Sequence, residues 1–244
     1  MESSTKFTSI RVGRNIGQSL FQISAYMTVM GTVPSKIILD GASSDSKDIF
    51  SEVATTVQDS SDDYTVTFDS YYRTCTSFQH ARWLAPKFLF RDRVLKLVSD
   101  NDLASDYDLV VGVLGAFGVT EDKCGAYIDK AISNLLDINT ESKKKSDIRV
   151  LIVTGLYQNI NISSGYEIRQ LSIKDAWPIM FRARNLLIYP DSFLTYWAGY
   201  LGYHDRVFMP TYGWELIPDQ YRLDLTSATV PSDLLFEGVT AILP

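Results

Sequence analysis

Short hydrophobic runs alternate along the chain with stretches of helical periodicity. The runs predict strands at Thr8–Val12, Lys36–Leu39, Tyr64–Phe68, Asp108–Leu114, Arg149–Val153, Ile168–Ser172, Leu186–Tyr189 and Val207–Pro210. Apolar residues at helical spacing predict helices at Gln18–Met30, Pro86–Val98, Thr120–Leu136, Ile173–Arg182 and Asp191–Leu201. The segment 42–63 is rich in Ser, Asp and Thr and predicts a loop with one short helix. The last predicted strand, Val207–Pro210, is expected to close the sheet.

This alternation of strands and helices predicts an α/β fold of parallel sheets flanked by helices. A polar run at Ser99–Asp102 predicts a boundary near residue 100, which divides the chain into α/β halves 1–100 and 101–244. Ligands of such sheets bind outside the carboxyl ends of the strands. The candidate binding loops are therefore Gly13–Gly17, Leu114–Val119 and Pro190–Thr195.

Composition and charge narrow the class of protein. The 244 residues are 45% hydrophobic with a net charge of −6, and an acidic chain lacks the basic surface that nucleic-acid binding needs. The longest apolar run, Leu109–Val119, is too short for a membrane span of about 20 residues. The polar N-terminus and only two cysteines, Cys75 and Cys124, favour a cytoplasmic protein. The two histidines, His80 and His204, fit no catalytic motif and are interpreted as surface or core residues.

Three segments carry a resemblance to a known family. Residues 13–22 (GRNIGQSLFQ) are similar to G-G-L-G-N-Q-[LM]-F-Q, the opening motif of the α-1,2-fucosyltransferases, with one additional residue before Gly17. Residues 191–201 (DSFLTYWAGYL) align without a gap with the family's N-S-S-F-S-W-W-G-A-W-L. Residues 206–210 (RVFMP), followed by Trp214, are similar to its K-V-I-A-P and a following aromatic residue. The chain therefore resembles this family in three places that stand in the family's order.

The resemblance implies a compact GT-B-like arrangement of two Rossmann-like halves, with the acceptor on 1–100 and the nucleotide sugar on 101–244. It implies inverting transfer of a deoxyhexose of the fucose or rhamnose type, from a GDP- or UDP-linked donor to a glycan or glycoprotein, without a metal or other cofactor. The donor-binding residues that it indicates, together with the glycines of the middle loop, are Gly13, Gly17, Gln18, Gly112, Gly115, Ser192, Thr195 and Tyr196.

The sequence departs from the family at its H-x-R-R-x-D motif. Gly112 stands at the histidine position, and Leu114 and Gly115 replace the two arginines. A guanidinium clamp on a diphosphate cannot form there. Arg14 is the preferred replacement cation, with Arg182 and Arg184 as alternatives.

The general base is not determined by spacing. Together with Arg14, Asp191 is the candidate catalytic residue, and Asp175 and Glu215 are alternative carboxylates. The D-x-D sequence Asp106–Asp108 precedes its strand, whereas the metal-binding motif of other transferases follows one, so a metal role is disfavoured.

Other interpretations stay open. Gly112, Gly115 and Gly118 either cradle a phosphate or allow tight strand–helix packing, which is the favoured interpretation. Ser192 either faces the phosphates or serves only as an N-cap. Two other classes remain as alternatives: a catalytically inactive glycan- or nucleotide-binding module on the same scaffold, and an unrelated nucleotide-cofactor enzyme that uses residues 112–118.

Overall fold

The computed structural model divides the chain into two compact units, Met1–Lys96 and Leu97–Pro244. The residues that the structure describes are 9–12, 17, 19–23, 26, 34–39, 56–59, 66–67, 103–115, 119, 121–138, 144–156, 160, 165–190, 192–210 and 238–242. The predicted helix Pro86–Val98 lies outside them. Each unit is built around its own parallel sheet, which bears out the predicted α/β class.

The first unit contains a four-stranded parallel sheet. Its strands are β1 (Ser9–Val12), β2 (Lys36–Leu39), β3 (Thr56–Asp59) and β4 (Val66–Thr67), in the order β3-β2-β1-β4. Residues 17, 19–23 and 26 are helical and lie within the predicted helix or next to it. Apolar side chains of β1, β2 and this helical stretch are buried: Ile10, Val12, Ile37, Ile38, Leu39, Leu20, Phe21, Ile23 and Tyr26.

The strand β3 corrects the prediction of a loop and helix over 42–63. Its sequence, Thr-Val-Gln-Asp, contains one strongly apolar residue, which gives no clear alternation. Among the described strands, β3 lies at one end of the sheet and pairs with β2 alone. A strand at the end of a sheet is held by backbone hydrogen bonds to a single neighbour, and it does not need apolar side chains on both faces. The hydrophobic pattern of the sequence is therefore a weak signal for such a strand.

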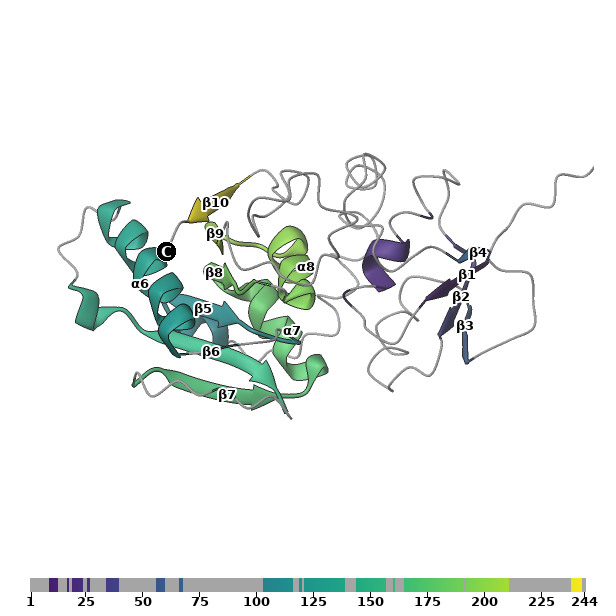
Figure 1. The fold of residues 1–244 in the computed structure, drawn as a ribbon, viewed down its shortest axis with the longest axis horizontal. Helices are drawn as coiled ribbons and strands as arrows, with labels where there is room; N and C mark the ends of the chain where they lie inside the picture. The colour runs from purple at the N-terminus through teal and green to yellow at the C-terminus, as the bar shows by residue number, and fades with distance from the viewer. Residues whose placement is uncertain are drawn as a thin grey trace, which may run out of the picture. The chain divides into compact units, whose positions relative to one another are not determined.

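The second unit contains a six-stranded parallel sheet (Figure 1). Its strands are β5 (Leu109–Gly112), β6 (Val150–Gly155), β7 (Glu167–Leu171), β8 (Asn185–Ile188), β9 (Arg206–Pro210) and β10 (Val239–Ile242). Their order is β10-β9-β8-β5-β6-β7, and every neighbouring pair is parallel. The strand β10 corrects the prediction that Val207–Pro210 closes the sheet, since β10 pairs with β9 on its outer side.

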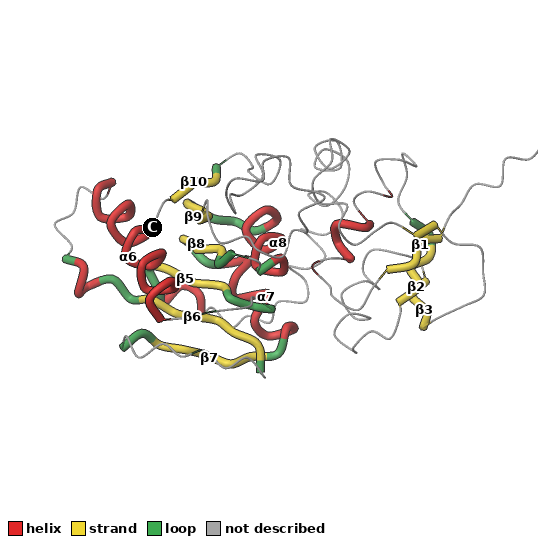
Figure 2. The backbone as a smooth tube through the Cα atoms, viewed as in Figure 1, coloured by secondary structure: helices red, strands yellow, loops and turns green. Residues whose placement is uncertain are grey.

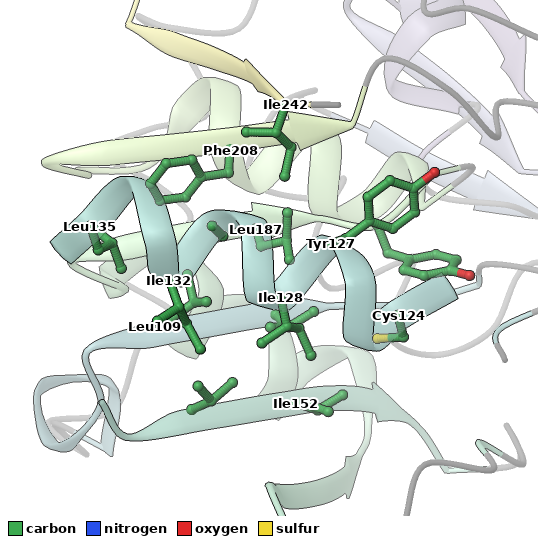
Figure 3. Close-up of a cluster of buried hydrophobic side chains, with 14 of the residues drawn as sticks. Leu109, Cys124, Tyr127, Ile128, Ile132, Leu135, Ile152, Leu187, Phe208 and Ile242 are labelled. Carbon is green, nitrogen blue, oxygen red and sulfur yellow. The ribbon is translucent and has the colours of Figure 1, made fainter. Parts of the chain in front are cut away.

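Helix α6 (Glu121–Ile138) covers one face of this sheet (Figure 3). Its buried residues recur three and four positions apart: Cys124, Tyr127, Ile128, Ala131, Ile132 and Leu135. Alternate strand residues, among them Leu109, Val111, Ile152, Leu187 and Phe208, meet this stripe in one cluster. Because side chains alternate between the two faces of a strand, the residues between them point to the opposite face.

Helices α7 (Ile173–Arg182) and α8 (Phe193–Leu201) pack against each other on that opposite face (Figure 2). The side chain of Ser172 caps α7 by accepting a hydrogen bond from the backbone N–H of Asp175 at 3.2 Å. Short 3₁₀ turns lie at Leu103–Asp106 (η1) and Lys145–Asp147 (η2). None of the helices in the described ranges has both the length and the apolar character that crossing a membrane requires.

Candidate functional site

The order of strands singles out one position on the six-stranded sheet. Strand β5 is followed outward by β6 and β7, whereas its other neighbour, β8, is followed outward by β9 and β10. The direction in which the chain builds the sheet therefore reverses between β5 and β8. Open α/β sheets bind ligands outside the carboxyl ends of the strands at this kind of switch point. Among the described residues, the candidate site is thus the edge formed by residues 113–115 after β5 and by residues 189, 190 and 192 after β8.

The loop after β5 leaves its strand through Gly115. The backbone N–H of Val113 still donates to the carbonyl of Val153 at 3.0 Å, so the sheet continues to this point. Gly115 has φ of 70°, a left-handed conformation that side chains other than glycine adopt at a cost. No described atom lies within 4 Å of the position that a Cβ would take. The turn therefore presents open backbone at the switch point.

Gly112 has a different role from Gly115. A Cβ at Gly112 would overlap with the side chain of Thr195 on α8 and would lie 2.6 Å from Met180 Sδ on α7. The absence of a side chain lets β5 approach both helices. For Gly112, the structure accordingly supports tight strand–helix packing, which the sequence favoured over a phosphate cradle. Gly118 lies outside the described residues.

The hydroxyl groups of Ser192 and Thr195 are turned into the protein interior. Both residues are fully buried. Ser192 Oγ donates to the carbonyl oxygen of Leu114 at 2.9 Å and lies 2.5 Å from Thr195 Oγ1, which is 3.5 Å from Met180 Sδ. The resemblance leads one to expect both side chains to face phosphates. In the structure, Ser192 instead bonds the start of α8 to the loop after β5, and Thr195 contacts Ser192 and Met180 on α7.

Helix α8 is buried along its whole length and has no charged residue. Tyr196, a predicted donor-binding residue, is 1% exposed, and its ring makes an edge contact with Trp197, with centroids 5.8 Å apart. The indole N–H of Trp177 on α7 donates to the carbonyl of Leu194 at 3.1 Å. The first turn of α8 contains no acidic side chain, so none within that turn offsets the positive end of the helix dipole.

The remaining predicted site residues fall into two groups. Gly17 is helical and belongs to the first unit. Gly13, Arg14, Gln18 and Asp191 lie outside the described residues.

The alternative cations lie elsewhere. Arg184 directly precedes β8, at the amino end of the strand, and its Nε donates to Asp205 Oδ2 at 2.7 Å on the exposed surface. Arg182 ends α7, two residues before Arg184. The amino and carboxyl ends of parallel strands lie at opposite edges of a sheet, so the position of Arg184 separates it from the switch point.

The D-x-D sequence also lies at the amino edge, as its position before β5 predicts. Asp108 Oδ2 accepts a hydrogen bond from the backbone N–H of Arg149 at 2.9 Å, and Tyr107 OH donates to Glu167 Oε2 at 2.5 Å. Burial, followed by this hydrogen bond, raises the pKa of Tyr107, and the same bond together with Arg169 lowers the pKa of Glu167. Within the part of the chain that the structure describes, no group of His, Cys, Asp or Glu residues is arranged to hold a metal ion.

Three contacts of α8 were not identified from the sequence. Trp177 and Met180 hold its first turn from α7, and their spacing of three residues on one helix face is the only local signal for this role. His204 lies against the other end of α8, with Nε2 3.0 Å from the carbonyl of Ala198. Nothing in the sequence around His204 distinguishes this position from a surface one.

Comparison with known proteins adds no relative. No family model matches the chain, and neither does a curated protein or a solved structure.

Proposed function

We propose that the chain is a glycosyltransferase that binds a nucleotide sugar at the switch point between β5 and β8. One observation carries the proposal: the helix start that resembles the fucosyltransferase donor motif directly follows β8, at the point where the strand order reverses. Counted within the second unit, the order β7-β6-β5-β8-β9-β10 is 3-2-1-4-5-6, the order of doubly wound nucleotide-binding sheets. This supports a Rossmann-like half for the donor.

The contacts of Ser192 and Thr195 refine the roles within this proposal. The two hydroxyls position α8, while backbone N–H groups at the start of α8 and the open turn at Gly115 hold the pyrophosphate. Arg14 is proposed as the cation that stabilises the leaving diphosphate, and Asp191 as the carboxylate nearest the reaction. The transferred sugar would be a deoxyhexose of the fucose or rhamnose type, and the first unit would complete a GT-B-like pair as the acceptor half.

A second candidate is an inactive nucleotide- or glycan-binding module on the same scaffold. The buried state of Ser192 and Thr195, together with Leu114 and Gly115 in place of the family's arginines, favours it over transfer. Without a charge that compensates the leaving group, a site can bind a nucleotide sugar and still fail to stabilise the departing diphosphate.

The first experiment separates the two candidates. The protein is incubated with GDP-, UDP- and dTDP-linked sugars and a panel of glycans that supply the acceptor hydroxyl, and free nucleotide is measured while a thermal-shift assay records the binding of each compound. Binding with release of nucleotide supports the transferase, and binding without release supports the module. If no nucleotide, nucleotide sugar or glycan raises the melting temperature, both fail, because a ligand that binds only the native state must stabilise it.

A matched pair of glycine variants then locates the site. Gly115 and Gly165 both have positive φ, 70° and 75°, and no described atom lies within 4 Å of either Cβ position. Alanine at either position introduces a similar backbone strain of about 1 kcal/mol. Only Gly115 lies at the switch point, so Gly115→Ala should weaken nucleotide binding while Gly165→Ala leaves it unchanged. Equal affinities in the two variants would remove this loop from the site.

A further inference from the structure

The imidazole of His204 lies between the ends of two helices. Its Nδ1 is 2.7 Å from the carbonyl oxygen of Ala183, the C-cap of α7, and its Nε2 is 3.0 Å from the carbonyl oxygen of Ala198, in the last turn of α8. Both ring nitrogens are therefore within hydrogen-bond distance of main-chain acceptors on different helices.

This arrangement distinguishes between the two protonation states of the ring. A carbonyl oxygen can only accept, and a neutral imidazole has one N–H donor and one nitrogen lone pair. The neutral ring would satisfy one carbonyl and place its lone pair against the other. The imidazolium donates to both. Because each carbonyl belongs to the C-terminal end of a helix, the negative ends of both helix dipoles also favour the charged ring.

The backbone around the ring is shaped to admit it. The N–H of Gly202 donates to the same Ala198 carbonyl at 2.8 Å, and a side chain at Gly202 would overlap with the ring of His204. The ring itself is half-buried. Glycine at this position thus lets one carbonyl accept from both the backbone and the imidazole.

Among the described residues, the carboxylate nearest in sequence to the ring is engaged by another group. Asp205, next to His204, pairs with Arg184 at 2.7 Å, ahead of β8. Arg182 ends α7 and Arg206 begins β9, whereas α8 contributes only the phenol groups of its tyrosines, Tyr196 and Tyr200. The contacts of His204 that carry the inference are therefore those with the two carbonyl groups, because both ring nitrogens lie against acceptors.

We propose that His204 is a pH-sensitive clamp that joins the C-terminal ends of α7 and α8 while its ring is charged. The folded state then holds the proton more tightly than the unfolded chain. Its stabilisation is fully present below about pH 6.5, where an ordinary histidine titrates, and is lost as the pH rises through the titration of the folded state. Because α8 starts at the proposed donor loop, nucleotide affinity should fall with it, a consequence that rests on the proposed function.

Nuclear magnetic resonance reads the protonation state directly. The chain has two histidines, so His80→Gln leaves His204 as the only imidazole, and His204→Gln confirms the assignment by loss of the signal. At pH 7, where an ordinary imidazole is mostly neutral, long-range ¹H–¹⁵N spectra should show both ring nitrogens protonated. A neutral ring with a single tautomer at pH 7 would overturn the proposal.

Hydrogen exchange tests the clamp itself. After correction for intrinsic exchange rates, the protection of α8 amides should fall about tenfold between pH 5.5 and pH 8 in the wild type, the loss expected for a charge-assisted contact at helix ends. His204→Gln should remove this dependence, and His204→Arg, whose charge is constant in this range, should show no slope. A wild-type slope retained in both variants would contradict the clamp. Neither readout involves nucleotide, so failure here is distinct from failure of the proposed function.

Discussion

The close approach of β5 to α7 and α8 predicts a severe effect of Gly112→Ala on the second unit. The added Cβ would overlap with Thr195 and lie 2.6 Å from Met180 Sδ. Methionine is flexible and can move aside, but Thr195 is fully buried and bonded to Ser192. Overpacking of a rigid core site costs about 1–3 kcal/mol, and the fixed threonine places this variant in the upper part of that range. We therefore expect a loss of about 2–3 kcal/mol.

Native-state hydrogen exchange measures this loss separately from any event in the first unit. At about 1.4 kcal/mol per factor of ten, protection of the slowest β5 and α8 amides should fall about 30-fold or more. Thr195→Ser removes the methyl group, which is the nearer of the two Thr195 atoms to the new Cβ, but keeps the hydroxyl oxygen, which would lie 2.5 Å from it. The double variant should therefore recover part of the loss.

Gly125→Ala is the matched control. Gly125 lies inside α6 with no described atom within 4 Å of its Cβ position, and alanine there should stabilise the helix by about 0.5–1 kcal/mol. Wild-type protection in Gly112→Ala, or a double variant no more stable than Gly112→Ala alone, would refute the packing argument.

Two further predictions concern ionisable groups. Burial raises the pKa of the Cys124 thiol to about 12. In a Cys75→Ser background, the native protein should therefore resist a thiol reagent at pH 8 and react only as fast as the core around Cys124 opens. Rapid labelling under native conditions would place the thiol outside the core. The hydrogen bond from Tyr107 lowers the pKa of Glu167, so its stabilisation is present above the ordinary glutamate pKa of about 4.3 and is lost as the pH falls through the folded value. Tyr107→Phe should therefore flatten the acid decline of stability in unfolding curves between about pH 5 and pH 3, and an unchanged decline would contradict this contribution.

Local sequence pattern was sufficient to predict the helices and strands that have a complete apolar face. The bounds of β2 and α7 agree with the prediction to the residue, and α6 carries the expected buried stripe. These elements bury enough apolar surface to reveal their period in the sequence alone. Strands β3 and β10 were missed because each lies at one end of its sheet in the described part of the chain and is short.

At the candidate site, the sequence predicted the loops but not which of them lie next to each other. The sequence located the loops after β5 and β8 because strands followed by helices imply parallel sheets with ligands at the carboxyl edge. It could not place β5 beside β8, since strand order depends on contacts between segments far apart in the chain. Only this pairing identifies which two loops form the switch point.

The orientation of side chains on α8 was likewise decided by tertiary structure. From the sequence, Ser192 and Thr195 at a helix start are equally compatible with a phosphate contact and with an internal one. The missing side chain at Gly112 gives Thr195 room against β5, and the Leu114 carbonyl accepts from Ser192, so both hydroxyls are satisfied inside the protein. Sequence thus determined the fold class and the elements with a clear apolar period, because those follow from local pattern. The direction of each polar group was decided by neighbours that only the folded chain brings together.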